Sequence, residues 1–211
     1  MSGSNAAERL ERLWAGDFGD EYVERNIEAA AGRGAFWRAQ IAELGPKSAL
    51  EVGCNVGANL RWLAELIGTE NVAGIDINER ALEILRDRVP GIDVRRAAAR
   101  TLPFPDASFD LVFTMGVLIH QPPEDLDQVM AEIVRCSSRY VLCGEYYADE
   151  LTEVPYRGHD GALFKMDFGA RYRDLFPHLR LVDRGFLPRS EGVWDDVTYW
   201  IFEKPPAARA R

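Results

Sequence analysis

The fold of this chain is decided by one segment, Ala49-Leu50-Glu51-Val52-Gly53-Cys54-Asn55-Val56-Gly57-Ala58-Asn59-Leu60. It begins as a short apolar strand, turns through two glycines and opens into a helical pattern. Gly53 and Gly57 have no Cβ, so the backbone there can adopt unusual dihedral angles and a ligand can lie against it. The following helix N-terminus offers unpaired N–H groups to a carboxylate or phosphate. The segment therefore predicts a ligand site at the strand's end, where Glu51 can accept a hydrogen bond from an ammonium or amide.

A second acidic residue follows at a suitable distance. The run Asn71-Val72-Ala73-Gly74-Ile75-Asp76 is typical of a buried strand that ends in an acid. An acid about 20 residues after a glycine loop commonly holds ribose hydroxyls in nucleotide-binding α/β folds. A glycine loop alone is a weak signal, since an ordinary strand–turn–helix unit can contain the same residues. The loop, Asp76 and the later segments together favour a nucleoside cofactor.

Strands and helices alternate from residue 48 onward. Strands are predicted at 48–53, 71–76, 92–96, 109–115 and 139–145, and helices at 58–67, 78–89 and 123–135. A loop over 146–164, a short helix near 168–176 and a closing strand pair at 179–186 and 197–202 complete the pattern. This alternation predicts a parallel sheet with helices on both faces, whose ligand lies beyond the carboxyl ends of the strands.

The chain is predicted to form one domain with a helical N-terminal part. Residues 1–45 are expected to be a helical lid, with residues 1–8 frayed. An alternative is that these helices only cover an edge of the sheet. Residues 46–204 are expected to be the ligand-binding core, and 205–211 a tail.

The composition is that of a soluble globular protein. The chain has 211 residues, of which 47% are hydrophobic and 28% charged. Its net charge of −9 disfavours a nucleic-acid partner, which normally requires a basic face, and no apolar run reaches the length of a membrane span. Cys54, Cys136 and Cys143 lack metal-like spacing and suit reduced thiols. We therefore expect a cytoplasmic protein without a metal site.

Two segments resemble class I S-adenosylmethionine-dependent methyltransferases. Glu51-x-Gly53-x-Asn55-x-Gly57 with the downstream Asp76 is similar to their first motif, and Leu102-Pro103-Phe104-Pro105-Asp106-Ala107-Ser108-Phe109-Asp110-Leu111-Val112 is similar to the stretch before their fourth strand. The chain departs from the usual pattern at Asn55, where a glycine is common, and at Ala97-Ala98-Ala99, where an acid often contacts adenine. The resemblance implies a Rossmann-like class I methyltransferase fold, with a mostly parallel seven-stranded sheet, helices on both faces and an antiparallel last strand.

Further segments look like the pseudaminic acid biosynthesis-associated methylase family. They are Trp14-x-Gly16-x-Phe18-Gly19-x-x-Tyr22-x-x-Arg25-Asn26, Gly116-Val117-Leu118-Ile119-His120, Glu145-Tyr146-Tyr147, Val154-Pro155-Tyr156-Arg157-Gly158-His159 and Phe164-Lys165-x-Asp167-Phe168. Met166 stands where an arginine is expected. This resemblance implies an enzyme that methylates an oxygen or nitrogen of a small molecule. The acceptor would be a sugar of a nonulosonic acid pathway or a natural-product intermediate.

The resemblance implies S-adenosyl-L-methionine as cofactor and S-adenosyl-L-homocysteine as product. The residues expected to bind it are Glu51, Gly53, Asn55, Gly57, Asp76, Ile77, Ala99, Arg100, Met115 and Gly116. The loop around Gly53 should hold the methionine part and Asp76 the ribose. Ile77, Ala99 and Arg100 should flank adenine.

Methyl transfer needs no metal and no covalent enzyme intermediate, but a general base helps an oxygen or protonated amine acceptor. His120 and Glu145 are the candidate bases, because His120 follows the predicted strand 109–115 and Glu145 ends the predicted strand 139–145. His120 could instead cap the next helix. The expected substrate-binding residues are Tyr22, Arg25, Asn26, Tyr146, Tyr147, Tyr156, Arg157 and His159. Arg157 could clamp a carboxylate, or be a surface residue paired with Asp160 or Asp167.

Two other functions fit the same motifs. One is cyclisation or lysis of S-adenosylmethionine itself, and the other is a non-catalytic module that binds the nucleoside. The acceptor molecule, the acceptor atom and the choice between a monomer and a homodimer are left open by the sequence.

Overall fold

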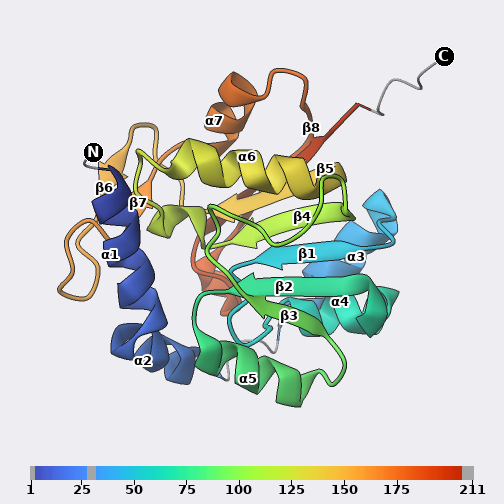
Figure 1. The fold of residues 1–211 in the computed structure, drawn as a ribbon. Coiled ribbons are helices and arrows are strands. Elements are labelled where there is room, and N and C mark those ends of the chain that lie inside the picture. Colours follow the sequence, from blue (N-terminus) through green and yellow to red (C-terminus); the bar gives the residue numbers. More distant parts are fainter. Residues whose placement is uncertain (1–2, 28–31, 206–211) are drawn as a thin grey trace.

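The computed structural model describes residues 3–27 and 32–205, and Figure 1 shows how the helices and strands are arranged. The helices are α1 (Gly3–Ala15), α2 (Asp17–Asn26), α3 (Gly34–Leu44), α4 (Leu60–Ile67), α5 (Glu79–Arg88), α6 (Leu126–Cys136) and α7 (Phe168–Leu175). The strands are β1 (Ala49–Val52), β2 (Val72–Asp76), β3 (Asp93–Arg96), β4 (Phe109–Met115), β5 (Ser137–Glu145), β6 (Thr152–Glu153), β7 (Phe164–Lys165), β8 (Arg180–Leu187) and β9 (Val197–Glu203). Short 3₁₀ turns occur at η1 (Thr69–Asn71), η2 (Leu118–His120) and η3 (Arg189–Glu191).

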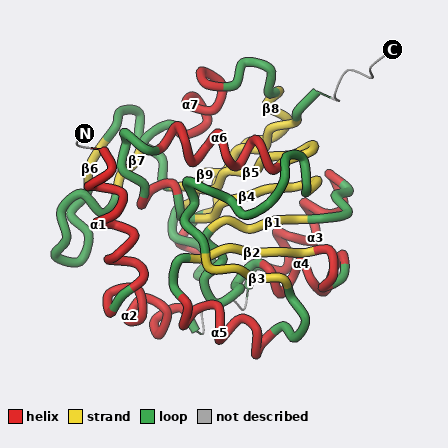
Figure 2. The backbone as a smooth tube through the Cα atoms, in the orientation of Figure 1, coloured by secondary structure: helices red, strands yellow, loops and turns green. Residues whose placement is uncertain are grey.

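The main sheet has seven strands in the order β3-β2-β1-β4-β5-β9-β8. The pairs β1–β2, β1–β4, β2–β3 and β4–β5 are parallel. The last strand, β9, runs antiparallel to both of its neighbours, β5 and β8. Figure 2 shows the strands as one layer with helices around it. The predicted fold, a mostly parallel seven-stranded sheet with an antiparallel last strand, is confirmed.

Both faces of the sheet are covered because successive side chains of a strand point to opposite faces. On β1, Leu50 packs in the cluster that contains the apolar side of α6 and α7. Its neighbour Ala49 packs in the other cluster, with side chains from α3, α4 and α5. In Figure 1, α6 and α7 lie on the opposite side of the strands from α3 and α4. The central strands β1, β2 and β4 are therefore mostly buried, whereas the edge strand β3 buries only Val94.

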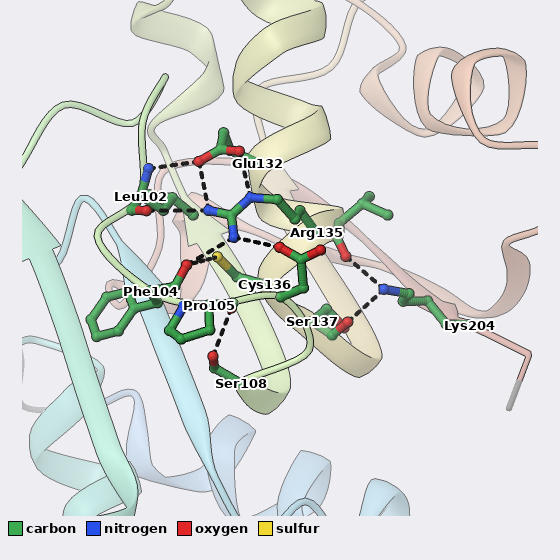
Figure 3. Close-up of polar contacts among 11 residues, drawn as sticks. Leu102, Phe104, Pro105, Ser108, Glu132, Arg135, Cys136, Ser137 and Lys204 are labelled. Carbon is green, nitrogen blue, oxygen red and sulfur yellow. Dashed lines mark hydrogen bonds and ion pairs between the residues drawn. The ribbon is translucent and has the colours of Figure 1, made fainter. Parts of the chain in front are cut away.

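The segment before β4 is fixed to α6 by one arginine (Figure 3). The Arg135 guanidinium donates to the carbonyl oxygens of Leu102 (3.2 Å) and Phe104 (2.8 Å) and pairs with Glu132 at 2.6 Å. Glu132 in turn accepts the backbone N–H of Leu102 at 2.8 Å. Lys204 closes the same helix end by donating to carbonyl oxygens there, which offsets the helix dipole. The Leu-Pro-Phe-Pro segment thus has a structural role here.

Several boundaries differ from those expected. Helix α1 begins at Gly3 rather than after residue 8, because Ala7 and Leu10 bury their side chains; residues 1 and 2 lie outside the described residues. Helix α3 is no part of a lid, since Trp37 is fully buried against Phe113 of the sheet, with ring centroids 4.6 Å apart. Helices α1 and α2 lie beyond the strand ends (Figure 1). The hairpin β6–β7 was not predicted, and 206–211 of the expected tail lies outside the described residues.

Within residues 3–27 and 32–205, none of the helices combines the length and apolar character needed to cross a bilayer. The same residues contain no group of three histidine, cysteine or acidic side chains that could hold a metal ion.

Candidate active site

A cavity lies at the carboxyl ends of β1, β2 and β4, underneath α1 and α2. Its empty volume is about 1230 Å³, counting the part open to solvent. Figure 1 shows α1 and α2 crossing beyond the tips of these strands. The strand order changes direction here, since β1 pairs with β2 on one side and with β4 on the other. This is where open α/β sheets hold their ligands.

The glycine loop is shaped by backbone angles that few residues tolerate. Gly53 and Gly57 have φ of 77° each, and Asn55 between them has φ of 45°. A Cβ on Gly53 would lie 2.4 Å from a methyl group of Val117, so glycine is required there for space as well. The Asn55 side-chain oxygen is buried and has no hydrogen-bond partner among the described residues. Gly53 and Asn55 both belong to the cavity wall.

Gly57 has a different role from the one expected. It does not line the cavity, and a Cβ there would lie 2.2 Å from Leu85 of α5. Gly57 therefore allows the loop to pack closely against α5, and the prediction that it contacts the cofactor is corrected.

Asp76 ends β2 and faces the loop across the cavity floor. One carboxylate oxygen accepts the backbone N–H of Asn55 at 2.8 Å, and the other accepts that of Asn78 at 2.9 Å. Burial raises the pKa of Asp76, while these hydrogen bonds act in the opposite direction. Asn78 caps α5 by accepting the N–H of Ala81. The predicted proximity of Asn55 and Asp76 is confirmed by their hydrogen bond.

Glu51 is 2% exposed and lines the same cavity. Its Oε1 accepts a hydrogen bond from Asn59 Nδ2 at 2.5 Å, and its Oε2 has no partner among the described residues. Burial raises the pKa of Glu51 to about 8, against the opposing effects of Asn59 and of Arg33. A buried acceptor without a partner is costly, which is the pattern of a site completed by a ligand donor.

Arg33 is a site residue that the sequence analysis missed. It precedes α3 and donates from Nη1 to Asn59 Oδ1 at 3.1 Å, and its guanidinium stacks 4.5 Å from the Trp194 ring. Its Nε is buried without a partner among the described residues. Burial lowers the pKa of Arg33, and the nearby Glu51 carboxylate acts against that shift. No motif surrounds Arg33; its position between two glycines just before a helix was the available signal.

The opposite end of the cavity carries the residues predicted to flank adenine. Ile77, Ala99 and Arg100 all line it, as do Met115 and Gly116 at the end of β4. The Arg100 guanidinium is paired with the carboxylate of Glu11 on α1, at 2.7 Å and 3.1 Å. This ion pair joins the loop after β3 to the helix that covers the cavity.

His120 lies where this cavity meets a second one. Its Nδ1 is 2.7 Å from the carbonyl oxygen of Ala162, so we assign the proton to Nδ1 and the free lone pair to Nε2. Its ring packs 4.5 Å from Trp14 and 5.2 Å from Tyr156, centroid to centroid. Burial lowers the pKa of His120 to about 4, so the imidazole is neutral at physiological pH. Nε2 can accept a proton or a hydrogen bond from a ligand.

Glu145, the other candidate base, does not face either cavity. It is fully buried, and its two oxygens accept the backbone N–H groups of Val117 and Ile119 at 3.2 Å each. Burial raises the pKa of Glu145 to about 7, and these hydrogen bonds oppose the shift. The expectation that it shares the rim with His120 is corrected: its carboxylate holds the turn after β4.

The second cavity adjoins the first and has an empty volume of about 530 Å³, counting the part open to solvent. Four residues predicted to bind substrate line it, together with Trp194 and Asp195, which the sequence analysis did not assign to the site. The four are Tyr22, Asn26, Tyr146 and Tyr156.

The other four predicted substrate residues lie outside both cavities. Arg25 is exposed and 3.7 Å from Glu21, and Tyr147 donates to Asp149 at 2.5 Å. Arg157 is exposed on a turn, with φ of 50°, over the outer side of Tyr156. His159 packs against Phe18 with ring centroids 4.8 Å apart. Their contact with a substrate stays a prediction that the lining of these two cavities does not support.

The fold is the Rossmann-like fold of class I methyltransferases, and the cavity lies where that fold binds its ligand. Residues 49–139 match the family described as "Methyltransferase domain". Methyltransferase GfsG of Streptomyces halstedii is 41% identical over 92 residues, which cover 41% of this chain and 32% of the relative. A phthiotriol/phenolphthiotriol dimycocerosates methyltransferase of Mycobacterium tuberculosis is 34% identical over 99 residues, 46% of this chain and 36% of the relative. The matches thus span about a third of these relatives.

Solved structures resemble the chain over more of its length. The 1,6-didemethyltoxoflavin-N1-methyltransferase of Burkholderia thailandensis, with bound 1,6-didemethyltoxoflavin and S-adenosylhomocysteine, has a TM-score of 0.76 at 16% identity and covers 97% of this chain and 91% of that one. The [4+2]-cyclase SpnF has a TM-score of 0.62 at 16% identity and covers 82% of this chain and 81% of that one. Together with the domain match, these findings support S-adenosylmethionine as the cofactor. The narrower resemblance to the pseudaminic acid-associated family stays a prediction.

Proposed function

We propose that this chain is an S-adenosylmethionine-dependent methyltransferase that acts on a small molecule. One observation carries the proposal. The buried Glu51 carboxylate and the Arg33 guanidinium both line the cavity, each with a buried atom that lacks a partner among the described residues. An acid and an arginine side by side suit the ammonium and carboxylate of an amino acid. Asp76, beyond the glycine loop, suits the ribose hydroxyls of a nucleoside.

The residues present fit this cofactor along its whole length. Glu51 Oε2 would accept from the ammonium, Arg33 would bind the carboxylate, and Ile77 and Ala99 would flank adenine. When bound, the cofactor supplies a methyl group on a sulfonium. The chain excludes water by covering the site with α1 and α2, joined to the core by the Glu11–Arg100 ion pair.

His120 is the residue we assign to proton handling. Its Nδ1–H is held by the Ala162 carbonyl, which orients Nε2 as the acceptor atom at the junction of the two cavities. A neutral imidazole there can take a hydrogen bond from the acceptor's N–H or O–H and pass a proton to solvent. Glu145 has no part in this step.

The relatives support a small-molecule acceptor. One relative is named as a phthiotriol/phenolphthiotriol dimycocerosates methyltransferase, and one solved neighbour as a 1,6-didemethyltoxoflavin methyltransferase. Of the two predicted acceptors, a sugar of a nonulosonic acid pathway and a natural-product intermediate, we keep the natural-product intermediate, because the second cavity has aromatic side chains in its wall.

The proposal is tested by calorimetric titration with S-adenosylhomocysteine. We expect binding that Asp76→Ala weakens by about 100-fold, because a bidentate contact to two hydroxyls is lost. Tyr147→Phe, outside both cavities, is the control and should bind normally. Absence of binding by the unmutated protein would refute the proposal.

A different reaction on the same cofactor is a second candidate, because one fold neighbour is named as a cyclase. Incubation of S-adenosylmethionine with the protein alone, followed by mass spectrometry, separates the two. A methyltransferase should leave the cofactor intact without an acceptor, whereas a cyclase or lyase should consume it. A module that only binds the nucleoside should leave it intact with every acceptor offered.

A further inference from the structure

The second cavity, which we call the acceptor chamber, is built largely from aromatic side chains. Tyr22, Tyr146, Tyr156 and Trp194 line it, and His120 joins it to the cofactor cavity. The Tyr156 ring lies 6.3 Å from that of Trp14, and the Tyr22 ring lies 5.2 Å from the same indole, on the cofactor side. Aromatic side chains in the wall of a cavity favour a ligand that is itself an aromatic ring.

The chamber also presents hydrogen-bonding groups with unused capacity. The hydroxyls of Tyr22, Tyr146 and Tyr156 make no hydrogen bond to any residue that the structure describes, and each side chain is only half-buried. Burial raises the pKa of Tyr22 to about 12 and also raises that of Tyr146, so both hydroxyls stay protonated. Together with His120 Nε2, they can meet the polar edge of a ring.

The charges around the acceptor chamber disfavour an acceptor that carries a carboxylate. Among the described residues that line it, Arg33 is the only lysine or arginine, and the proposed function assigns it to the carboxylate of the cofactor. Asp195 adds a carboxylate at the exposed rim, 3.9 Å from the Arg189 guanidinium, and its charge adds to burial in raising the pKa of Tyr22 and Tyr146. Arg157, the residue expected to clamp a carboxylate, is outside. A carboxylate in this chamber would find a like charge and no free cation.

The base at the junction of the two cavities limits which group of the acceptor can be the nucleophile. With Glu145 committed to the backbone, His120 is the titratable base at the junction, and its imidazole is a weak one. Alkylamines and phenols hold their protons up to pH of about 10 and would need a stronger base. A ring nitrogen that carries its lone pair in the uncharged form at neutral pH can attack before any proton is removed. The N–CH3 bond forms as the carbon–sulfur bond breaks and S-adenosylhomocysteine leaves. The cationic ring then gives up its own, now acidic, N–H or O–H proton to His120.

We propose that the acceptor is a flat, uncharged nitrogen heterocycle and that a sugar acid is excluded. This inference rests on the proposed function. The ring lies between the chamber's aromatic side chains, its polar edge contacts the tyrosine hydroxyls and His120, and its nitrogen faces the cofactor cavity. Asp195 repels anionic variants of the same ring.

The test uses the protein loaded with S-adenosylhomocysteine and two probes that differ by one carboxylate, 4-hydroxyquinoline and 4-hydroxyquinoline-2-carboxylate. Binding is measured by calorimetry and, for weak complexes, by saturation-transfer NMR. We expect the neutral ring to bind about three- to tenfold more tightly, the effect of one exposed like charge nearby. N-acetylneuraminic acid, an anionic sugar, should bind more weakly than either.

Variants of residues in the acceptor chamber test whether the probes bind there. Tyr156→Leu should lower the affinity for the neutral probe by about tenfold. Tyr156→Phe, which keeps the ring, should lower it by about threefold or less. Asp195→Asn should reduce the preference for the neutral over the anionic probe. Tyr147→Leu, outside the chamber, is the matched control and should leave both probes unaffected.

Two results would overturn the inference. One is equal or tighter binding of either anionic probe, and the other is failure of 4-hydroxyquinoline to bind the loaded protein. Because loading with S-adenosylhomocysteine is measured first, its failure would refute the proposed function instead. The two failures are therefore distinguishable.

Discussion

Replacing Glu51 with glutamine should stabilise the cofactor-free protein while weakening its binding of S-adenosylhomocysteine. Burial raises the pKa of Glu51 from 4.5 to about 8, so the folded protein holds a proton that the unfolded chain has already lost over that range. The free energy of unfolding therefore falls as pH rises from about 4.5 to 8. One pKa unit corresponds to about 1.4 kcal/mol. Because of this residue alone, the free energy of unfolding should fall by about 3 kcal/mol from about pH 5 to pH 8.

The assay is urea unfolding without ligand at several pH values in that range. The stability of Glu51→Gln should rise relative to the unmutated protein by about 3 kcal/mol from the acidic to the basic end. Glu65→Gln, an exposed acid on α4, is the control for a change in overall charge and should show no such divergence.

Binding should respond in the opposite direction. The ligand ammonium favours ionised Glu51. The affinity of the unmutated protein for S-adenosylhomocysteine should therefore rise from about pH 6 to pH 8, because fewer Glu51 side chains must lose a proton when the ligand binds. Glu51→Gln should bind about 30-fold more weakly, the loss of a charged hydrogen bond of about 2 kcal/mol, and should show no such rise. Undiminished affinity in this variant, or the same pH slope in both proteins, would refute the reasoning.

Three further predictions concern other contacts of the structure. Arg135→Leu should lower the free energy of unfolding by about 2 kcal/mol in urea titration, because two backbone carbonyls and an acid lose their partner, without changing S-adenosylhomocysteine affinity; a loss of affinity would contradict a purely structural role. His120→Gln should bind S-adenosylhomocysteine normally but transfer methyl groups more slowly, and in the unmutated protein the His120 ring should not titrate between about pH 5.5 and 8 by NMR, since its pKa is about 4. Glu11→Gln should speed S-adenosylhomocysteine release by about two- to fivefold in stopped-flow fluorescence, with the difference shrinking in high salt, because a partly exposed ion pair with Arg100 is worth about 1 kcal/mol; an unchanged release rate would mean that the pair does not hold the covering helix.

The fold could be predicted from the sequence because its signals are local and repeated. The central strands β1, β2 and β4 contain short apolar runs, and helices such as α5 have a periodic face and a recognisable start residue. The hairpin β6–β7 was missed because two residues per strand are too few to show alternation. Helix α3 was misassigned because a helical pattern does not say which surface it packs against.

Site residues could be predicted from the sequence where their role depends on backbone conformation or on their position in a strand. Gly53 and Asn55 could be predicted because the loop needs their backbone conformations. Asp76 could be predicted because the last residue of a parallel strand lies at the end of the sheet where the ligand binds. Glu145 also ends a strand, yet its carboxylate turns inward to two backbone N–H groups. Strand position fixes where a residue's backbone lies, not which partners its side chain meets.

The sequence by itself determined the sheet, the loop and the acid beside it, because those depend on contacts between residues near each other in the chain. Only the tertiary structure decided that Arg33 faces Glu51, that His120 rather than Glu145 reaches the cavity, and that Arg157 stays outside. These relations join segments far apart in the sequence. They are set by how the covering helices and late loops pack on the sheet, and no local pattern encodes that packing.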